Sequence, residues 1–405
     1  MVVWNSFLND ARVLKEAQTL QSAGYKVTVF ALHTPGVTKK SETTAEGIKI
    51  VRIARSPLWT WRKKHLTTAN GNAQAQGKKT PGPIKKSSLK GQLLLIIARS
   101  WTHSWLVCQL VRSKPDLVHS HDVNTLPTAW LASVIARVPL VYDAHEISTD
   151  REGYTSFRKV VGWIEKRLMP RAAGTITTTD TRAKFFARAY GISRPLVLQN
   201  RPRYLVVERS ERIRNDLNLQ ETWPIVLYQG GLQQGRGLER IIDVAQEVKN
   251  AYFVFVGGGR LEPKLKEQTG RLNLKDRVYF IDTVSLDALP YYTASADIGV
   301  QAIENTCLNH FSTDSNKVFE YVMGGLPVIS SNLPEIRKLM KKHGFGVLVE
   351  AGSNNSLKEA IQQLVDDKIL RDELSRKSST ARLKLNWEDQ ESKLIDFYLE
   401  ISQGC

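Results

Sequence analysis

The sequence predicts an α/β protein with two doubly wound domains that face each other across a cleft. Three observations carry this prediction. Short apolar runs alternate with amphipathic stretches along the whole chain, as in parallel strands joined by helical crossovers. A length of 405 residues suits two domains of ordinary size. Charge also divides the chain, because residues 1–200 hold 30 Lys and Arg against 12 Asp and Glu, whereas residues 201–405 hold 27 against 28.

Residues 1–200 are expected to form the first domain. The stump of a strand over 1–4 precedes a loop and a helix that begins at Asp10. Further strands are expected over 27–32, 48–53, 117–119, 140–142, 174–178 and 196–198. Helices are expected over 91–111, 124–137, 156–168 and 181–190. Residues 195–204, which include two prolines, mark the hinge to the second domain.

A basic segment interrupts this first domain. Residues 47–115 contain no Asp or Glu but 14 Lys and Arg. Within them, 63–90 are polar and predicted to form a mobile basic loop. The helix over 91–111 sets apolar and aromatic residues beside lysines, which suits an anionic membrane surface. A core helix next to a solvated loop explains the same pattern equally well.

Cysteine usage and the N-terminus indicate the compartment. Cys108, Cys307 and Cys405 lie far apart and form no CxxC pair, so a disulfide framework is not expected and a reducing cytosol fits. No signal peptide precedes the first helix. With the basic first half, this predicts a cytoplasmic protein that is peripheral on the inner face of the plasma membrane.

Residues 201–385 are expected to form the second domain, and 386–405 carry a last helix. Strands are expected over 225–228, 252–256, 278–281, 298–302, 326–329 and 346–349. Helices are expected over 238–248, 261–272, 286–294, 334–342, 355–366 and 387–401. Ligands of such sheets bind past the carboxyl ends of the strands.

The most informative stretch is 309–331, which has the pattern of a loop, a helix, a glycine stop and a buried strand. Asp314 or Ser315 is expected to cap the helix. Asn316, Lys317 and Glu320 share one helix face. A helix N-terminus with a lysine would face phosphate, and Glu320 would accept ribose hydroxyls. The alternative is a surface helix with a Lys317–Glu320 ion pair.

Two glycine-rich loops follow neighbouring strands of the second half. Gly230 and Gly231 lead to Arg236 in the first loop, and Gly257 leads to Arg260 in the second. Glycine lets the backbone approach a phosphate, and arginine adds a fork of donors. Together with the 309–331 stretch, the loops predict a diphosphate site. No Asp-x-Asp pair occurs, so no metal that bridges diphosphate to protein is expected.

Three strand ends in the first half carry polar side chains. Asn5 with Asp10, His121 with Asp122, and His145 are therefore expected to line a site at this edge of the sheet. Metal ligation by His119, His121 and His145 is a weaker alternative.

Taken together, the motifs around Asp10, His145, Asn200, Gly230 and Glu320 resemble those of bacterial family 4 glycosyltransferases, whose GT-B fold has two Rossmann-like domains. The resemblance covers almost the whole chain. It implies a retaining, metal-independent transfer, with the donor in the C-terminal domain and the acceptor in the N-terminal domain. The last helix would cross back onto the first domain.

The same resemblance implies roles for single residues. Glu320 matches the glutamate that holds the ribose, and Arg236 matches the basic residue on the diphosphate. Lys317 lies in a subfamily motif, and His145 matches the histidine near the reacting centre. Ser312 and Gly231 depart from the family pattern, since a glutamate and a basic residue are usual there. The predicted donor site also includes His310, Phe311 and Val284.

The predicted function is transfer of a sugar from a nucleotide diphosphate sugar, with UDP-glucose the best candidate. The acceptor is expected to be lipid-linked or a saccharide, in cell-surface or extracellular polysaccharide synthesis. A second hypothesis is another GT-B sugar-nucleotide enzyme, such as an epimerase. A third is a basic nucleic-acid-binding module, but that leaves Glu320 and Arg236 without a role, so no nucleic-acid partner is expected. No cofactor is expected, because the nucleotide sugar is a substrate.

Overall fold

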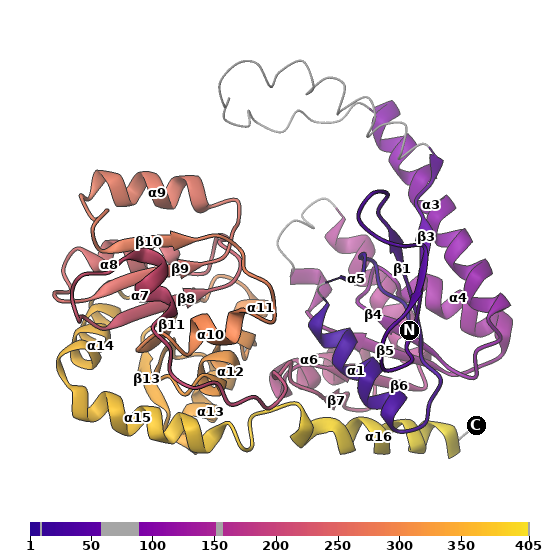
Figure 1. The fold of residues 1–405 in the computed structure, drawn as a ribbon. Helices are drawn as coiled ribbons and strands as arrows, with labels where there is room; N and C mark the ends of the chain where they lie inside the picture. Colours follow the sequence, from indigo (N-terminus) through magenta and orange to yellow (C-terminus); the bar gives the residue numbers. More distant parts are fainter. Residues whose placement is uncertain (9, 58–88, 151–156, 404–405) are drawn as a thin grey trace.

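A computed structural model describes residues 1–8, 10–57, 89–150 and 157–403. The predicted mobile loop at 63–90 falls almost wholly outside these residues. Two α/β lobes lie side by side, and helix α16 (Glu388–Gln403) extends from the C-terminal lobe along the N-terminal one (Figure 1). The predicted fold class, with two doubly wound domains, is confirmed.

The N-terminal lobe is built on two short sheets joined by the first residues of the chain. One has the order β1 (Thr28–His33), β3 (Lys49–Ala54), β2 (Ser41–Thr43), and the other runs β4 (Val118–His121), β5 (Leu140–Ala144), β6 (Gly174–Thr177), β7 (Leu196–Val197). Val2 forms parallel bridges to both Phe30 and Ser120 and so lies between β1 and β4. The strand order therefore reverses beside Val2, where a doubly wound sheet places its ligand.

Helices cover this sheet. They are α1 (Ala11–Ser22), α3 (Leu89–Arg112), α4 (Leu126–Ala136), α5 (Arg158–Leu168) and α6 (Asp180–Tyr190), with the short helices η1 (Ser148–Asp150) and η2 (Met169–Arg171). The first helix begins beside Asp10 as predicted, and the Asp10 side chain caps α1 by accepting from the backbone N–H of Val13. The last helix also belongs to this core, because Trp387, Leu394 and Tyr398 are buried among its apolar residues.

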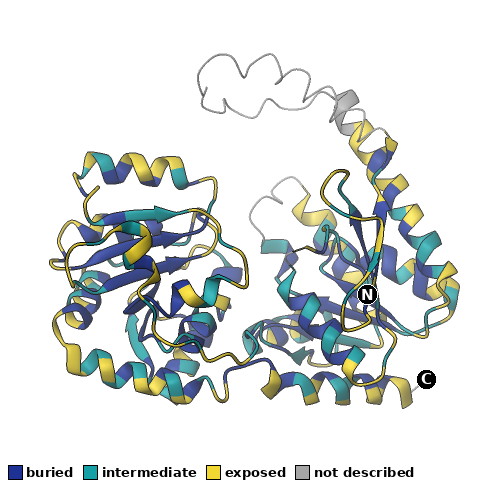
Figure 2. Ribbon diagram, in the orientation of Figure 1, coloured by how far each residue is buried: buried dark blue, intermediate teal, exposed yellow. Residues whose placement is uncertain are grey.

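Helix α3 packs in the core with one side and leaves apolar side chains exposed on the rest of its surface. Ala98, Leu106 and Leu110 are buried, and the helix packs against α4. Most of its remaining apolar surface is exposed, including Trp101 at 58% (Figure 2). By length and composition, Leu93–Arg112 is apolar enough to cross a membrane. Within its most apolar stretch, 28% is buried inside the protein.

The C-terminal lobe holds one parallel sheet. Its order is β10 (Val278–Ile281), β9 (Tyr252–Val256), β8 (Ile225–Gln229), β11 (Ile298–Gln301), β12 (Val328–Ser331), β13 (Gly346–Val349). Its helices are α7 (Arg212–Leu217), α8 (Leu238–Ala245), α9 (Glu262–Arg271), α10 (Leu289–Thr293), α11 (Leu308–Phe311), α12 (Asn316–Met323), α13 (Pro334–His343), α14 (Asn354–Asp366) and α15 (Lys368–Ala381). The order reverses between β8 and β11, so both glycine loops and the loop before α12 meet at the switch point.

Several local expectations were wrong. The strand over 1–4 is reduced to the bridge at Val2, and β2, α7, α11 and α15 were not predicted. The expected cap of α12 is absent: Ser315 occupies the N-cap position at φ 39°, and no side chain caps the helix there. Asp314 instead accepts a 3.0 Å hydrogen bond from Gln199, which ties this loop to the hinge.

Candidate functional site

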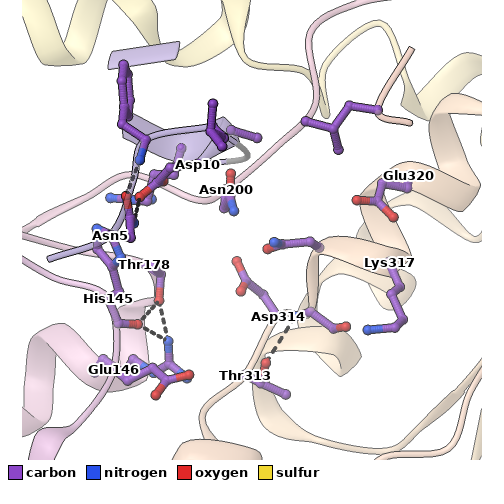
Figure 3. Close-up of a pocket in the computed structure, with 18 of the residues that line it drawn as sticks. Asn5, Asp10, His145, Glu146, Thr178, Asn200, Thr313, Asp314, Lys317 and Glu320 are labelled. Atoms are coloured by element: carbon purple, nitrogen blue, oxygen red, sulfur yellow. Dashed lines mark hydrogen bonds between the residues drawn. The ribbon is translucent and has the colours of Figure 1, made fainter. Parts of the chain in front are cut away.

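A cleft of about 690 Å³ opens between the two lobes. Asn5, Asp10 and His145 line its N-terminal wall, and Lys317 and Glu320 line the facing wall on α12 (Figure 3). The cleft thus joins the switch points of the two sheets. Both walls carry charged side chains, which suits a polar, charged ligand more than an apolar one.

On the C-terminal wall, Lys317 and Glu320 point to separate partners. The Glu320 carboxylate accepts a 2.6 Å hydrogen bond from Gln229 Nε2. The Lys317 ammonium lies 5.3 Å from the centre of the Tyr228 ring. Among the described residues no ion pair joins the two, so the alternative of a plain surface pair does not describe this face. Burial and neighbouring Arg236 lower the pKa of Lys317, and Glu320 raises it in part, to about 8.

The glycine loops pack against each other beneath Lys317. A Cβ on Gly257 would lie 2.3 Å from the carbonyl oxygen of Gly230, and φ there is +134°. A Cβ on Gly230 would lie 2.9 Å from Lys317 Cε. Only glycine permits this approach. Arg236, which follows the first loop, lines the cleft beside Lys317, so two cations lie next to the N-terminus of α12.

On the N-terminal wall, His145 is held between two carboxylates. Its Nε2 lies 2.9 Å from Asp143 Oδ2, and its Nδ1 lies 3.8 Å from Asp122 Oδ2. Arg12 forms a two-point hydrogen bond to Asp143 at 2.7 and 3.0 Å. Burial lowers the pKa of His145, but Asp143 and then Asp122 raise it more, to about 9.

The loop before α12 is fastened to the N-terminal lobe. Arg182 of α6 donates to Ser312 Oγ at 3.1 Å and to the Asn309 carbonyl at 3.1 Å. The Asn309 side chain exchanges hydrogen bonds of 2.8 and 2.9 Å with the backbone of Ile147. Asp150 accepts from the backbone of Leu308. The cleft is therefore bounded at this end by direct contact between the domains.

The structure brings some of the predicted site residues together and leaves others aside. Those that line the cleft are Asn5, Asp10, His145, Arg236, Asn316, Lys317 and Glu320. Those outside the lining are His121, Asp122, Gly230, Gly231, Gly257, Arg260, Val284, His310, Phe311 and Ser312. Ser312 is fully buried, and its hydroxyl accepts a hydrogen bond from Arg182. Val284 packs against the core of the C-terminal lobe.

Sequence reasoning missed several lining residues. They are Arg12, Glu146, Thr178, Arg182, Asn200, Leu286, Thr313 and Asp314, among others. Arg12, Glu146 and Asn200 belong to the motifs around Asp10, His145 and Asn200 that carry the family resemblance, so the resemblance was a signal that could have found them. Arg182 had no such signal, since its polar partners in the loop before α12 lie 127 and 130 residues away.

Two parallel α/β domains with a charged cleft at their switch points define a GT-B-type protein. Two family models match the chain: "Glycosyl transferase 4-like domain" over residues 10–201 and "Glycosyl transferases group 1" over residues 209–380. The chain belongs to the family 4 glycosyltransferases.

Relatives and solved structures agree with this membership. The chain is 23% identical over 283 residues to alpha-D-kanosaminyltransferase of Streptomyces kanamyceticus, covering 65% of the chain and 71% of the relative. It is 23% identical over 304 residues to phosphatidyl-myo-inositol mannosyltransferase of Mycobacterium leprae, covering 73% and 76%. In fold it resembles sucrose-phosphate synthase of Thermosynechococcus elongatus (TM-score 0.74, 17% identity, covering 97% and 93%). It also resembles Anabaena Alr3699/HepE in complex with UDP-glucose (TM-score 0.70, 16% identity, covering 98% of each chain).

Proposed function

We propose that this glycosyltransferase transfers glucose from UDP-glucose with retention of configuration, without a metal bridging the diphosphate to the protein. The observation that carries the proposal is the grouping of Arg236, Lys317 and Glu320 beside the N-terminus of α12. A leaving diphosphate gains negative charge as the glycosidic bond breaks. Two fixed cations and the helix N-terminus would stabilise that charge. The choice of UDP-glucose is supported by the Anabaena structure of similar fold that contains it.

The N-terminal wall would position the sugar and the acceptor. His145 is fixed by Asp143, so its ring can orient the donor sugar from the side opposite α12. In a retaining transfer on one face of the sugar, the leaving phosphate oxygen takes the proton of the acceptor hydroxyl, and His145 need not act as the base. Asn5 and Asp10, joined by a 2.7 Å hydrogen bond, would hold the acceptor.

The test is release and transfer from a defined donor. Incubation with UDP-glucose and membrane lipid extract should release UDP and label a lipid or saccharide product. NMR of the product should show the anomeric configuration of the donor. If no nucleotide diphosphate is released from any common sugar nucleotide, the proposal fails; an inverted product would refute retention alone.

The acceptor is proposed to be lipid-linked and reached at an anionic inner membrane. Exposed apolar side chains recur on three helices that pack in the order α3, α4, α5: Leu93, Leu94, Ile96, Ile97, Trp101, Trp105, Leu131, Val134, Ile135, Val160 and Trp163. Basic side chains, among them Arg112, Arg158, Lys159 and Lys166, occur on the same helices. Apolar side chains flanked by cations suit the interface of an anionic bilayer.

Vesicle sedimentation tests the membrane proposal. The chain should sediment with vesicles of anionic phospholipid and much less with zwitterionic ones. Trp101→Ser should weaken this binding, whereas Ile369→Ser, at a position 82% exposed on α15 of the nearly neutral lobe, should not. Equal binding of both variants, or none by the unmodified chain, would refute the membrane role of α3.

A further inference from the structure

Behind the N-terminal wall of the cleft, four buried side chains with metal-ligating groups converge. They are Glu16 on α1, His119 and His121 on β4, and Asp143 on β5. One ligand atom from each lies within 4.8 Å of all the others. His121 Nδ1 and Asp143 Oδ2 are 3.5 Å apart, and His119 Nε2 and Glu16 Oε2 are 3.9 Å apart. Tetrahedral zinc, with bonds of about 2.0–2.2 Å, needs ligand spacings of roughly 3.3–3.6 Å.

These side chains leave polar atoms without hydrogen-bond partners. In the described part of the chain, no hydrogen bond reaches Glu16 Oε1 and Oε2, His119 Nε2, or His121 Nδ1 and Nε2. The three residues are at most 2% exposed, so water outside the protein does not satisfy them. A buried polar atom left unpaired costs about 1–3 kcal/mol, and native structures contain few of them. Five such atoms in one cluster point to a shared ligand.

The guanidinium beside the cluster is already committed elsewhere. Arg12 Nε lies 3.1 Å from Glu16 Oε1, but the guanidinium donates its hydrogen bonds to Asp143 and to the Leu198 carbonyl. Asp143 keeps one acceptor position for a ligand, on Oδ1, because Oδ2 already bonds to Arg12 Nε and His145 Nε2, and Oδ1 accepts only from Arg12 Nη2.

The surroundings also orient one histidine for ligation. The Tyr398 hydroxyl lies 2.6 Å from His119 Nδ1, which leaves Nε2 directed at Glu16. A ligating histidine almost always uses its second ring nitrogen for a hydrogen bond of this kind. Since Tyr398 belongs to α16, the cluster would tie the last helix to the sheet.

We propose that Glu16, His119, His121 and Asp143 bind one Zn²⁺ ion. Two imidazoles and two carboxylates favour zinc over magnesium or calcium, which prefer oxygen ligands alone. The ion would be structural: it would bind no substrate, and it would hold Asp143, which in turn fixes His145. This set differs from the predicted group of histidines, because His145 stands outside it and Glu16 and Asp143 take part.

Metal analysis of the full chain tests the site without reference to activity. After equilibration with Zn²⁺ and dialysis against metal-free buffer, the protein should retain about one zinc per chain by inductively coupled plasma mass spectrometry. His121→Ala should lose it. His33→Gln should keep it, because His33 is not one of the four proposed ligands. His33 is a suitable control because it is a partly buried histidine of the same lobe, with its Nδ1 3.0 Å from Thr38 Oγ1. Retention of zinc by His121→Ala would overturn the proposal. Unmodified protein that holds no zinc would also overturn it, and the polar atoms of the cluster would then be paired by water or by shared protons.

A second measurement needs no variant and so does not depend on whether His121→Ala folds. Co²⁺ added to metal-free unmodified protein should give the visible absorption bands of a tetrahedral site, and one equivalent of Zn²⁺ should abolish them. Only the weak spectrum of octahedral Co²⁺ would overturn the proposal. Neither measurement uses a nucleotide sugar, so failure here and failure of the proposed transfer are separate results.

Discussion

The affinity for UDP should fall as pH rises from 7 to 8.5, because Lys317 loses its proton in that range. Burial and Arg236 lower the pKa of its ammonium, and Glu320 offsets part of that, to about 8. The other groups facing the ammonium do not add a titration here: arginine stays protonated in proteins, and burial raises the pKa of the Tyr228 hydroxyl. The charged form is the one that stabilises a diphosphate.

The magnitude follows from the protonated fraction. With a pKa of about 8, the fraction of charged Lys317 falls from about 0.9 at pH 7 to about 0.25 at pH 8.5. If UDP binds only the charged form, its affinity should fall about fourfold, or about 0.8 kcal/mol. At pH 8, binding should draw about half a proton from solution. Calorimetry in two buffers with different heats of ionisation measures both quantities.

Lys317→Arg is the matched control, since arginine keeps its charge throughout this range. Its UDP affinity should therefore change little between pH 7 and 8.5. An unmodified chain whose affinity is equally flat, with no proton uptake at pH 8, would show that Lys317 is not the group that binds the diphosphate.

Three other variants probe the cleft. Glu320→Ala should weaken UDP binding at least about tenfold by calorimetry. Glu304→Ala, at a position outside the cleft lining, is the control and should leave the affinity unchanged. If the two variants bind UDP equally well, Glu320 does not hold the ribose. Gly257→Ala should lower the free energy of unfolding in urea by about 2 kcal/mol or more, because its Cβ would lie 2.3 Å from the Gly230 carbonyl oxygen. Gly231→Ala is the control and should change it little, because no atom lies nearer than 3.5 Å to the new Cβ. Arg182→Ala should lower both the unfolding midpoint and kcat, because it removes buried charged hydrogen bonds worth about 2–4 kcal/mol; an unchanged midpoint would contradict that reasoning.

Residue patterns within short stretches of the sequence predicted the architecture and one wall of the cleft. Strands buried on both faces, such as 252–256, stand out as apolar runs, and this one ends at a glycine. Lys317 and Glu320 lie on one face of α12 because their spacing is that of a helical turn, which the sequence alone predicts. The glycine loops added Arg236, and the resemblance placed His145, already expected at a strand end, near the reacting centre.

Contacts between distant segments were not predictable in this way. The sequence predicted no role for Asp143, but the structure makes it the common partner of Arg12 and His145. The missing cap of α12 has the same origin, because Asp314 bonds to Gln199 in the hinge rather than to its own helix. A side chain's tendency to bond within its own helix is overridden when a distant residue offers its buried charged group a better hydrogen-bond partner.

The loop before α12 shows what this means for sugar recognition. Family members usually place a glutamate where this chain has Ser312, and here the Ser312 hydroxyl bonds to Arg182 of the opposite domain. The backbone of Asn309 is held by the same guanidinium. If the C-terminal domain holds the donor as proposed, the loop nearest its sugar is thus positioned by the N-terminal domain. On that proposal we expect a change in domain separation to affect sugar recognition more than binding of the diphosphate.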